Sequence, residues 1–276
     1  QTPGIMKKEI EIAKELAVRA GTILMKHYSE GPAVDWKGTA SPVTAADRSA
    51  GAFLVEELRR QFPEDGILCE EEADKSAPLT QRRIWVIDPM DGTKQFINRL
   101  GEFAVMIGMA VDGIATLGVV YQPTMDKLYV AASGMGAFLV QGQTTRPLRV
   151  SPESDASAMT IALSRSHNSP PVEQICQRLG VRESIRTGSI GIKVGLICEG
   201  RAHLYLHTQE GPSQWDTCAP EAILREAGGR MTDLSNNSLR YDPPGLRHVN
   251  GVIASSGAIH NRIVEVARSV LSGTRL

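Results

Sequence analysis

The sequence predicts an α/β (α+β) fold of two subdomains, an N-terminal one at 1–150 and a C-terminal one at 151–276. Two helical patterns open the chain, and strand candidates joined by short turns follow up to about residue 140, which is typical of an antiparallel sheet. After about residue 150, strand-like and helix-like segments alternate. This alternation favours a mixed sheet with covering helices.

The first two elements are predicted to be helices. Over 6–29 apolar residues recur at helical spacing, and Gly31-Pro32 ends this pattern. A loop is expected over 35–42. Residues 44–47, TAAD, have the form of a capping box, so a second helix is predicted from there to about residue 62.

The rest of the first half is predicted to form an antiparallel sheet. Asp112-Gly113 is a typical hairpin turn, so the strands on either side of it are expected to pair. The predicted strands are 66–70, 83–88, 103–110, 115–121, 127–131 and 137–140.

The second half is predicted to form a mixed sheet covered by helices. Its predicted strands are 159–163, 183–187, 202–206, 230–233 and 250–254, and its predicted helices are 171–179, 189–199, 216–227 and 257–272.

Charge and composition argue against several classes of partner. The chain carries 30 basic and 31 acidic residues, a net charge of −1, so no nucleic-acid polymer is expected to bind. No apolar run is long enough for a membrane span, and the first residues do not resemble a signal peptide. The four cysteines contain no C-x-x-C pair, so reduced thiols in a cytoplasmic protein are expected.

The segment WVIDPMDGT, residues 85–93, places Asp88 and Asp91 at the end of a predicted strand. Two carboxylates on one tight turn repel each other unless a cation lies between them, and Mg²⁺ prefers such hard oxygen ligands. The Met90 carbonyl is a further candidate ligand. Gly92 and Thr93 begin a helix-like run, so their amides are expected to bind a phosphate. The alternative is an aspartate helix cap beside an unrelated turn.

Three further acidic residues lie at the end of a strand or the start of a helix. Glu70 is at the exit of the first predicted strand, Asp216 is at the start of a predicted helix, and Asp47 is in the capping box. For Glu70 the alternative is a solvated acidic loop. For Asp47 and Asp216 it is helix capping, although a capping carboxylate can also face a cation.

Together these elements resemble the magnesium-dependent, lithium-sensitive phosphatase superfamily that includes the inositol monophosphatases. The family pattern has an acidic pair at a strand end, then W-x-x-D-P-x-D-G-T, and then W-D. These are Glu70-Glu71, residues 85–93 and Trp215-Asp216 in this sequence. The resemblance covers nearly the whole chain and implies an αβαβα sandwich, inhibition by Li⁺ and often a homodimer.

Within the superfamily, four segments resemble the 3'(2'),5'-bisphosphate nucleotidases. They are DGTKQF at 91–96, GEF at 101–103, SRSH at 164–167 and WDTCAPE at 215–221. This resemblance implies removal of the 3'-phosphate of adenosine 3',5'-bisphosphate. Its sulfated parent and inositol 1,4-bisphosphate are further substrates that the resemblance implies.

One position departs from the inositol monophosphatase pattern. Gln209 stands where those enzymes have a sugar-contacting glutamate, although Glu210 is adjacent. This departure argues against a simple inositol substrate, and an inositol monophosphatase or related sugar phosphatase is the alternative to a nucleotidase. A second alternative is a protein that is not an enzyme but only binds a metal or a nucleotide. The complete set of candidate metal ligands, together with Thr93, argues against this alternative.

The resemblance also implies the roles of the site residues, with two or three Mg²⁺ ions as cofactors. The implied metal ligands are Glu70, Asp88, Asp91, Asp216 and the Met90 carbonyl. Asp47 would help to hold a third ion, and Glu70 with the Thr93 hydroxyl would orient the attacking water. The amides of Gly92 and Thr93 would hold phosphate oxygens.

The leaving group of a small phosphorylated substrate is expected to contact the C-terminal subdomain. The candidate residues are Ser164, Arg165, Ser166, His167, Thr187, Gly188, Ser189 and Lys193. Residues 187–189 open a helix-like run and Lys193 lies one turn on, so a second phosphate would find helix amides and positive charge there. A surface helix lysine is the alternative for Lys193, and a polar loop residue is the alternative for His167.

Overall fold

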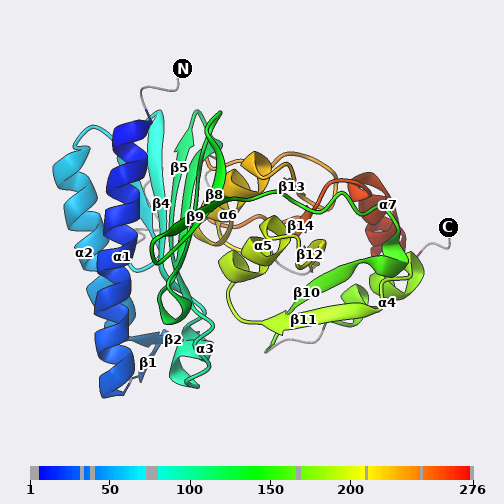
Figure 1. Cartoon of the computed structure of the whole chain (residues 1–276), viewed down its shortest axis with the longest axis horizontal. Helices are drawn as coiled ribbons and strands as arrows, with labels where there is room; N and C mark the ends of the chain where they lie inside the picture. The colour runs from blue at the N-terminus through cyan, green and yellow to red at the C-terminus, as the bar shows by residue number, and fades with distance from the viewer. Residues whose placement is uncertain are drawn as a thin grey trace.

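The computed structural model describes residues 6–31, 34–37, 41–72, 80–165, 169–208, 211–242 and 245–273. Its elements stack as helix, sheet, helix, sheet and helix (Figure 1), which confirms the expected α/β class and αβαβα sandwich. In the described residues the helices are α1 (Lys7–Glu30), α2 (Ala45–Gln61), α3 (Thr93–Ile97), α4 (Pro170–Leu179), α5 (Ile190–Cys198), α6 (Gln214–Glu226) and α7 (His260–Leu271).

The first sheet has seven strands in the order of the chain. They are β3 (Gly66–Cys69), β4 (Arg83–Asp91), β5 (Ala104–Val111), β6 (Ile114–Gln122), β7 (Lys127–Ala132), β8 (Gly136–Gln141) and β9 (Thr144–Pro147). β3 and β4 are parallel, and every later pair is antiparallel. The exposed edge strand β9 was not predicted, because its residues TTRP show no apolar alternation.

The second sheet is mixed, with the strand order β11-β10-β12-β14-β13. Its strands are β10 (Thr160–Ser164), β11 (Glu183–Thr187), β12 (Leu204–His207), β13 (Arg230–Thr232) and β14 (Val252–Ser255). β10 is parallel to both β11 and β12, whereas β14 is antiparallel to β12 and β13. The carboxyl ends of β10, β11 and β12 therefore meet at one edge of the sheet.

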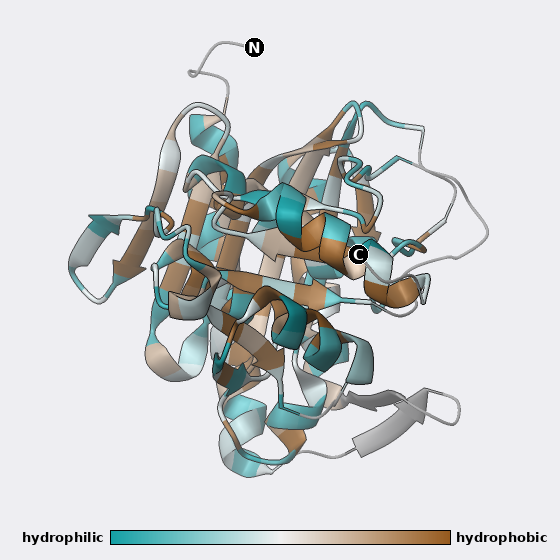
Figure 2. Cartoon of the chain, turned by 90° about the vertical axis from the view of Figure 1, so that its right-hand side faces the viewer, coloured by the Kyte–Doolittle hydropathy of each residue, from teal (hydrophilic) through white to brown (hydrophobic). Residues whose placement is uncertain are grey.

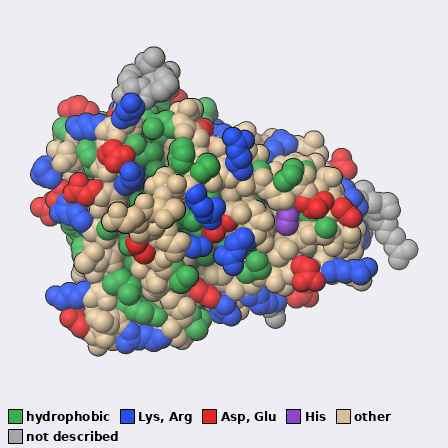
Figure 3. All heavy atoms as spheres, in the orientation of Figure 1, with side chains coloured by type: hydrophobic (Ala, Val, Ile, Leu, Met, Phe, Trp, Pro, Cys, Tyr) green, Lys and Arg blue, Asp and Glu red, His purple; other side chains and the backbone are tan. Residues whose placement is uncertain are grey.

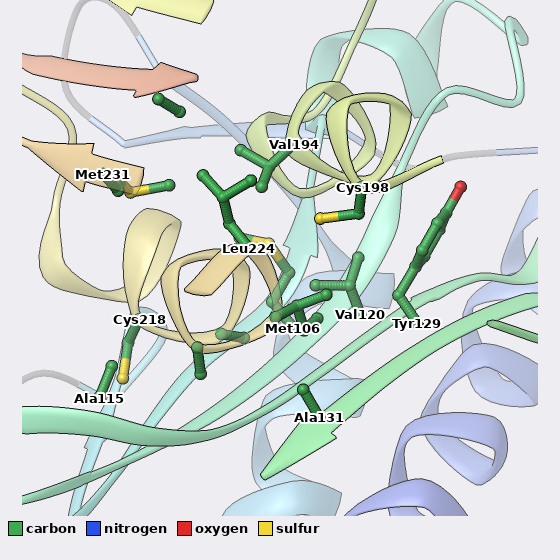
Figure 4. Close-up of a cluster of buried hydrophobic side chains, with 14 of the residues drawn as sticks. Met106, Ala115, Val120, Tyr129, Ala131, Val194, Cys198, Cys218, Leu224 and Met231 are labelled. Atoms are coloured by element: carbon green, nitrogen blue, oxygen red, sulfur yellow. The ribbon is translucent and has the colours of Figure 1, made fainter. Parts of the chain in front are cut away.

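The middle helical layer packs against both sheets. α6 contacts β5 and β6 on one side and β13 on the other, and α5 packs on α6. Figure 4 shows the resulting core, where Met106 and Val120 of the first sheet lie near Val194 of α5 and Leu224 of α6. Because this core is shared, the division into 1–150 and 151–276 stays a prediction about how the chain is organised.

The outer helical layers complete the two remaining cores. α1 and α2 cover the first sheet, and α4 and α7 cover the second. In α1 the predicted apolar stripe, which includes Leu16 and Leu24, is buried. Figure 2 looks toward the α4–α7 side and shows helices with hydrophilic and hydrophobic stripes in front of mostly hydrophobic strands, as expected for amphipathic helices on a sheet.

One predicted loop is wrong. The segment 35–42 contains parts of β1 (Val34–Lys37) and β2 (Ser41–Thr44), which form an antiparallel pair outside the two sheets. Each strand is only four residues long, VDWK and SPVT, and half of its residues are polar, so each is at the lower length limit for a strand pattern.

The surface charge is mixed, and the cysteines, which all lie within the described residues, form no disulfide. Basic and acidic side chains are interspersed on the face shown in Figure 3. No helix within the described ranges is both long enough and apolar enough to cross a membrane. The four cysteines are free thiols.

Candidate active site

A cleft of about 340 Å³ opens where the parallel strands of both sheets end. β3 and β4 reach it from the first sheet, and β10, β11 and β12 reach it from the second, so loops of both halves meet there. Ligands usually bind at the carboxyl ends of strands in such sheets. The lining residues are Glu70, Asp91, Gly92, Thr93, Lys94, Gln95, Ser164, Arg165, Thr187, Gly188, Ser189, Ile190, Lys193, Tyr205, His207 and Asp216.

Asp88 and Asp91 both belong to β4, which corrects the tight turn predicted for them. Asp88 pairs with Met106 of β5 and Asp91 pairs with Ala104, so three steps along β4 match two steps along β5. The extra residue forms a β-bulge. In a regular strand, residues three positions apart face opposite sides of the sheet. The bulge therefore allows both carboxylates to face the same side.

The third carboxylate, Asp216, comes from the other half of the chain. It lies in the first turn of α6, where its Oδ2 accepts a hydrogen bond from the Ser213 N–H at 2.7 Å. Ligand oxygens of Asp88, Asp91 and Asp216 all lie within 4.8 Å of one another. Asp216 thus caps α6 and also faces the aspartate pair of β4.

Hydrogen bonds from neighbouring groups hold one oxygen of each aspartate. The Met90 N–H donates to Asp88 Oδ1 at 2.9 Å. Asp91 Oδ2 accepts from the Ser189 hydroxyl at 2.6 Å and from the Gly191 N–H at 3.0 Å, so it sits at the N-terminus of α5. These contacts orient the carboxylates, as outer partners of metal ligands do.

The electrostatics of the three-aspartate cluster match a cation site. Burial, reinforced by the charges of Glu70, Asp91 and Asp216, raises the pKa of Asp88 well above its ordinary value. Burial and the charges of Asp91 and Glu70 likewise raise the pKa of Asp216. Asp88 is buried and the other two aspartates are half-buried, and a nearby positive charge favours the ionised form of acids this close together. The all-oxygen donor set fits a hard divalent ion, so the cluster could hold one.

Glu70 lies next to this cluster. It directly follows β3, and its N–H donates to the Ile87 carbonyl at 3.1 Å, one residue before Asp88. Its side chain is half-buried and lines the cleft. The structure therefore places Glu70 beside the aspartates, as the sequence analysis expected for a strand exit.

Thr93 connects the cluster to Asp47. The Thr93 hydroxyl lies 3.2 Å from Asp47 Oδ1 and 3.3 Å from the Met90 carbonyl oxygen, both of which are acceptors. Asp47 is buried in the first turn of α2. The structure thus brings Thr93, Asp47 and the Met90 carbonyl together at one side of the cleft.

Gly92 starts the short helix α3 from a conformation that favours glycine. Its φ is +105°, and an added Cβ would lie 2.7 Å from the Glu102 carbonyl oxygen. Both the backbone angle and the lack of space therefore require glycine here. Gly92 and Thr93 line the cleft beside Asp91.

Lys193 is buried, so the alternative of a surface lysine is wrong. Its side chain comes from α5, and its Nζ lies 5.3 Å above the centre of the Tyr205 ring. Burial lowers the pKa of Lys193 to about 8, although the charges of Asp91, Asp216 and Glu102 oppose this shift. Lys193 therefore brings a positive charge to the same cleft, close enough to Asp91 and Asp216 for their charges to act on it.

The other predicted leaving-group residues have mixed outcomes. Ser164, Thr187 and Gly188 line the cleft. The Ser189 hydroxyl also borders it but is engaged by Asp91. Four residues named from the sequence lie outside the described residues: Ser166, His167, Gln209 and Glu210.

Several cleft residues were not found from the sequence. Tyr205 belongs to the strand predicted over 202–206, and His207 follows it directly. Their position at the end of a strand is the only signal that could have pointed to them. Glu102 lies in the GEF segment and receives contacts from the second half of the chain, which the sequence alone does not reveal.

Comparison with known proteins identifies the family. A model described as the inositol monophosphatase family matches residues 6–272. The chain is 36% identical over 248 residues to the 3'(2'),5'-bisphosphate nucleotidase CysQ of Salmonella typhimurium, covering 86% of this chain and 98% of that protein. It is 30% identical over 244 residues to inositol monophosphatase 1 of Solanum lycopersicum, covering 85% and 87%. The structure of CysQ from Bacteroides thetaiotaomicron is similar, with a TM-score of 0.77 and 29% identity over 91% of this chain and 98% of that one. The chain therefore belongs to the inositol monophosphatase family of phosphatases.

Proposed function

We propose that the protein is a Mg²⁺-dependent phosphomonoesterase that removes the 3'-phosphate of adenosine 3',5'-bisphosphate. The observation that carries this proposal is the buried Lys193, which faces the same cleft as the acidic cluster. A cation held by the aspartates would face the phosphate that is removed, and Lys193 would attract a second phosphate. The CysQ relatives, named as bisphosphate nucleotidases, support the same substrate class.

The metal ligands in this proposal are Glu70, Asp88, Asp91, Asp216 and the Met90 carbonyl. When bound, Mg²⁺ would supply positive charge to the transferred phosphate and acidify a water molecule. The number of ions, two or three, is part of the proposal, with Asp47 near the third. The carboxylates are already oriented by hydrogen bonds to their other oxygens, so little reorganisation is needed on binding.

Thr93, Asp47 and Glu70 carry the proton chemistry of the attacking water in this proposal. Asp47 accepts the Thr93 hydroxyl hydrogen, which leaves the Thr93 oxygen free to accept a hydrogen bond from water. Glu70, which lines the same cleft, would accept the proton that the water gives up. No covalent nucleophile is needed, because positioning and electrostatic stabilisation account for most of phosphoryl-transfer catalysis.

The phosphate and leaving group occupy opposite sides of the cleft in this proposal. The amides of Gly92 and Thr93 would hold oxygens of the phosphate that is removed. The leaving nucleoside and its 5'-phosphate would contact Ser164, Thr187, Gly188 and Lys193. The predicted contribution of His167 stays part of the proposal. The homodimer and the cytoplasmic location also stay predictions.

The test is a comparison of phosphate release from three substrates at matched concentrations with Mg²⁺. Adenosine 3',5'-bisphosphate should have a kcat/KM at least about tenfold above that of inositol 1-phosphate, a difference of about 1.4 kcal/mol in transition-state binding. Adenosine 3'-monophosphate, which lacks the second phosphate, should fall between them. The opposite preference would assign an inositol or related sugar phosphatase. Absence of release from every substrate would favour a non-catalytic binding protein.

A further inference from the structure

Glu102 joins the two halves of the chain across the cleft. It lies between α3 and β5, and its carboxylate accepts hydrogen bonds from the second half. Arg165, which follows β10, donates from Nε to Oε2 at 2.8 Å and from Nη2 to Oε1. The Gly188 N–H donates to Oε2 at 2.8 Å. A two-point Arg–carboxylate pair fixes orientation as well as distance, so Glu102 ties residues of two strand ends to the first half.

Arg165 is fixed from its own side as well. Its Nη2 donates to the Arg186 carbonyl at 2.9 Å, and its backbone N–H donates to the Thr187 carbonyl at 3.2 Å. Although partial burial opposes the shift, hydrogen bonds from Arg165 and Gly188 hold the pKa of Glu102 below its ordinary value. The carboxylate is thus ionised at neutral pH, and it neutralises Arg165. Arg165 is therefore engaged with protein groups of both halves of the chain.

Gly188 is the first residue of the turn whose next residue contacts Asp91. Ser189, the next residue, has φ +52°, a left-handed conformation that costs energy for a residue with a side chain. In this conformation its hydroxyl donates to Asp91 Oδ2 and accepts from the Ile192 N–H at 3.1 Å. The backbone at Gly188 also packs closely against the backbone of Glu102, because a Cβ added to Gly188 would lie 2.5 Å from the Glu102 carbonyl oxygen.

We propose that Glu102 is a positioning residue for the metal site. By binding Arg165 and the Gly188 N–H, it holds the strained turn that presents Ser189 to Asp91, and so sets the affinity of the aspartate cluster for a divalent cation. This inference rests on the part of the proposed function that assigns a cation to the cluster. It does not depend on which phosphorylated substrate is used.

Direct titration with Mn²⁺, followed by the electron paramagnetic resonance signal of the free ion and without substrate, tests the proposal. Loss of an immediate outer partner of a metal ligand typically weakens binding about 10- to 100-fold, and Ser189→Ala should fall in this range. Glu102 acts one step further away, so Glu102→Ala should raise the Mn²⁺ dissociation constant by about 3- to 10-fold. Glu102→Gln, which keeps an oxygen acceptor for the Gly188 N–H, should recover part of this loss.

The matched control is Arg82→Gln. Arg82 makes a similar two-point pair with Asp112, from Nε to Oδ1 at 2.9 Å and from Nη2 to Oδ2 at 2.9 Å, at the opposite end of β4 from the cluster. This variant should bind Mn²⁺ like the wild type. If Glu102→Ala and Glu102→Gln also bind like the wild type, Glu102 only joins the two halves and the inference is overturned. If the wild type itself binds no Mn²⁺, both the proposed metal site and the role of Glu102 are wrong.

Discussion

Replacing Asp88 by asparagine should stabilise the metal-free protein and abolish its activity. Asp88 is 2% exposed and accepts the Met90 N–H through Oδ1, and the asparagine oxygen can keep this hydrogen bond. The substitution therefore removes a buried charge while leaving the local packing nearly unchanged. What is lost is one anionic oxygen of the three-aspartate cluster.

The size of the stabilisation follows from the charges in the cluster. The ligand oxygens lie within 4.8 Å of one another. Unit charges at that distance repel by about 3.5 kcal/mol at an effective dielectric constant of about 20, and Asp88 has two such neighbours. Proton uptake limits this penalty. At pH 7, binding a proton that a normal aspartate releases near pH 3.9 costs about 4 kcal/mol. Allowing for partial relaxation, we expect a gain of about 2 to 4 kcal/mol, or at least roughly 5 °C in Tm for a chain of this size.

The stability difference between Asp88→Asn and the wild type should depend on pH. In the metal-free protein the pKa of Asp88 is raised by burial and by Glu70, Asp91 and Asp216, so the folded state retains a proton that the unfolded state releases. The stability linked to this proton is fully present below the unfolded pKa and is lost as pH rises through the raised folded pKa. The advantage of Asp88→Asn should therefore grow from pH 4 upward.

The assay is thermal unfolding in EDTA and in Mg²⁺, from pH 5 to pH 8. Saturation of one site at 100 times its Kd adds about 2.7 kcal/mol, so the wild type should gain Tm in Mg²⁺ and the variant should gain much less. Phosphate release by the variant should fall to background. A variant that is less stable than the wild type in EDTA at pH 7, or that keeps its activity, would refute the reasoning.

Three further predictions concern other parts of the cleft and the contact between the halves. Gly92→Ala should lower kcat by at least about tenfold, because its φ of +105° and the nearby Glu102 carbonyl force the start of α3 to shift. An unchanged kcat would contradict this. Lys193→Met should raise the KM for adenosine 3',5'-bisphosphate about tenfold and leave the KM for p-nitrophenyl phosphate nearly unchanged. In the wild type, the KM for adenosine 3',5'-bisphosphate should increase as the pH rises above about 8, because Lys193 loses its charge there. Glu199→Gln should lower the free energy of unfolding in urea by about 1 to 3 kcal/mol, and no change would contradict a bridging role for the carboxylate. Glu199 accepts hydrogen bonds from Lys127, Tyr129 and Arg146.

Local patterns predicted most of the fold because most elements bury one clear face. The hydrophobic run of β5 and the stripe of α1 are buried as expected. β1, β2 and β9 escaped prediction because each is only four residues long and at least half polar, although each pairs with its neighbour in the chain. The bulge in β4 was also missed, since its extra residue is defined only by the register against β5.

The candidate site shows the same limit. The aspartates and Glu70 were found because each lies at a strand exit or a helix start and because the motifs around them resemble the family pattern. The burial of Lys193 was left open, although its helix, IGIKVGLIC, is apolar on nearly every side, which is the pattern of a helix enclosed between two layers. The contact of Asp91 with Ser189 joins residues 98 positions apart. Only the packing of the two sheets on the middle helices brings these residues together.

The middle helical layer explains why the acidic cluster can exist at all. Asp91 belongs to the first sheet, yet its Oδ2 is held at the N-terminus of α5, whose partial positive charge favours an anion. Asp216 is held in the same way at the N-terminus of α6. Two of the three carboxylates are thus held by helices that lie between the sheets, and a cation would offset the loss of solvation and the repulsion that remain. The geometry of the site therefore depends on the packing that joins the two halves, and substitutions at that junction are expected to act on metal binding even when they touch no ligand.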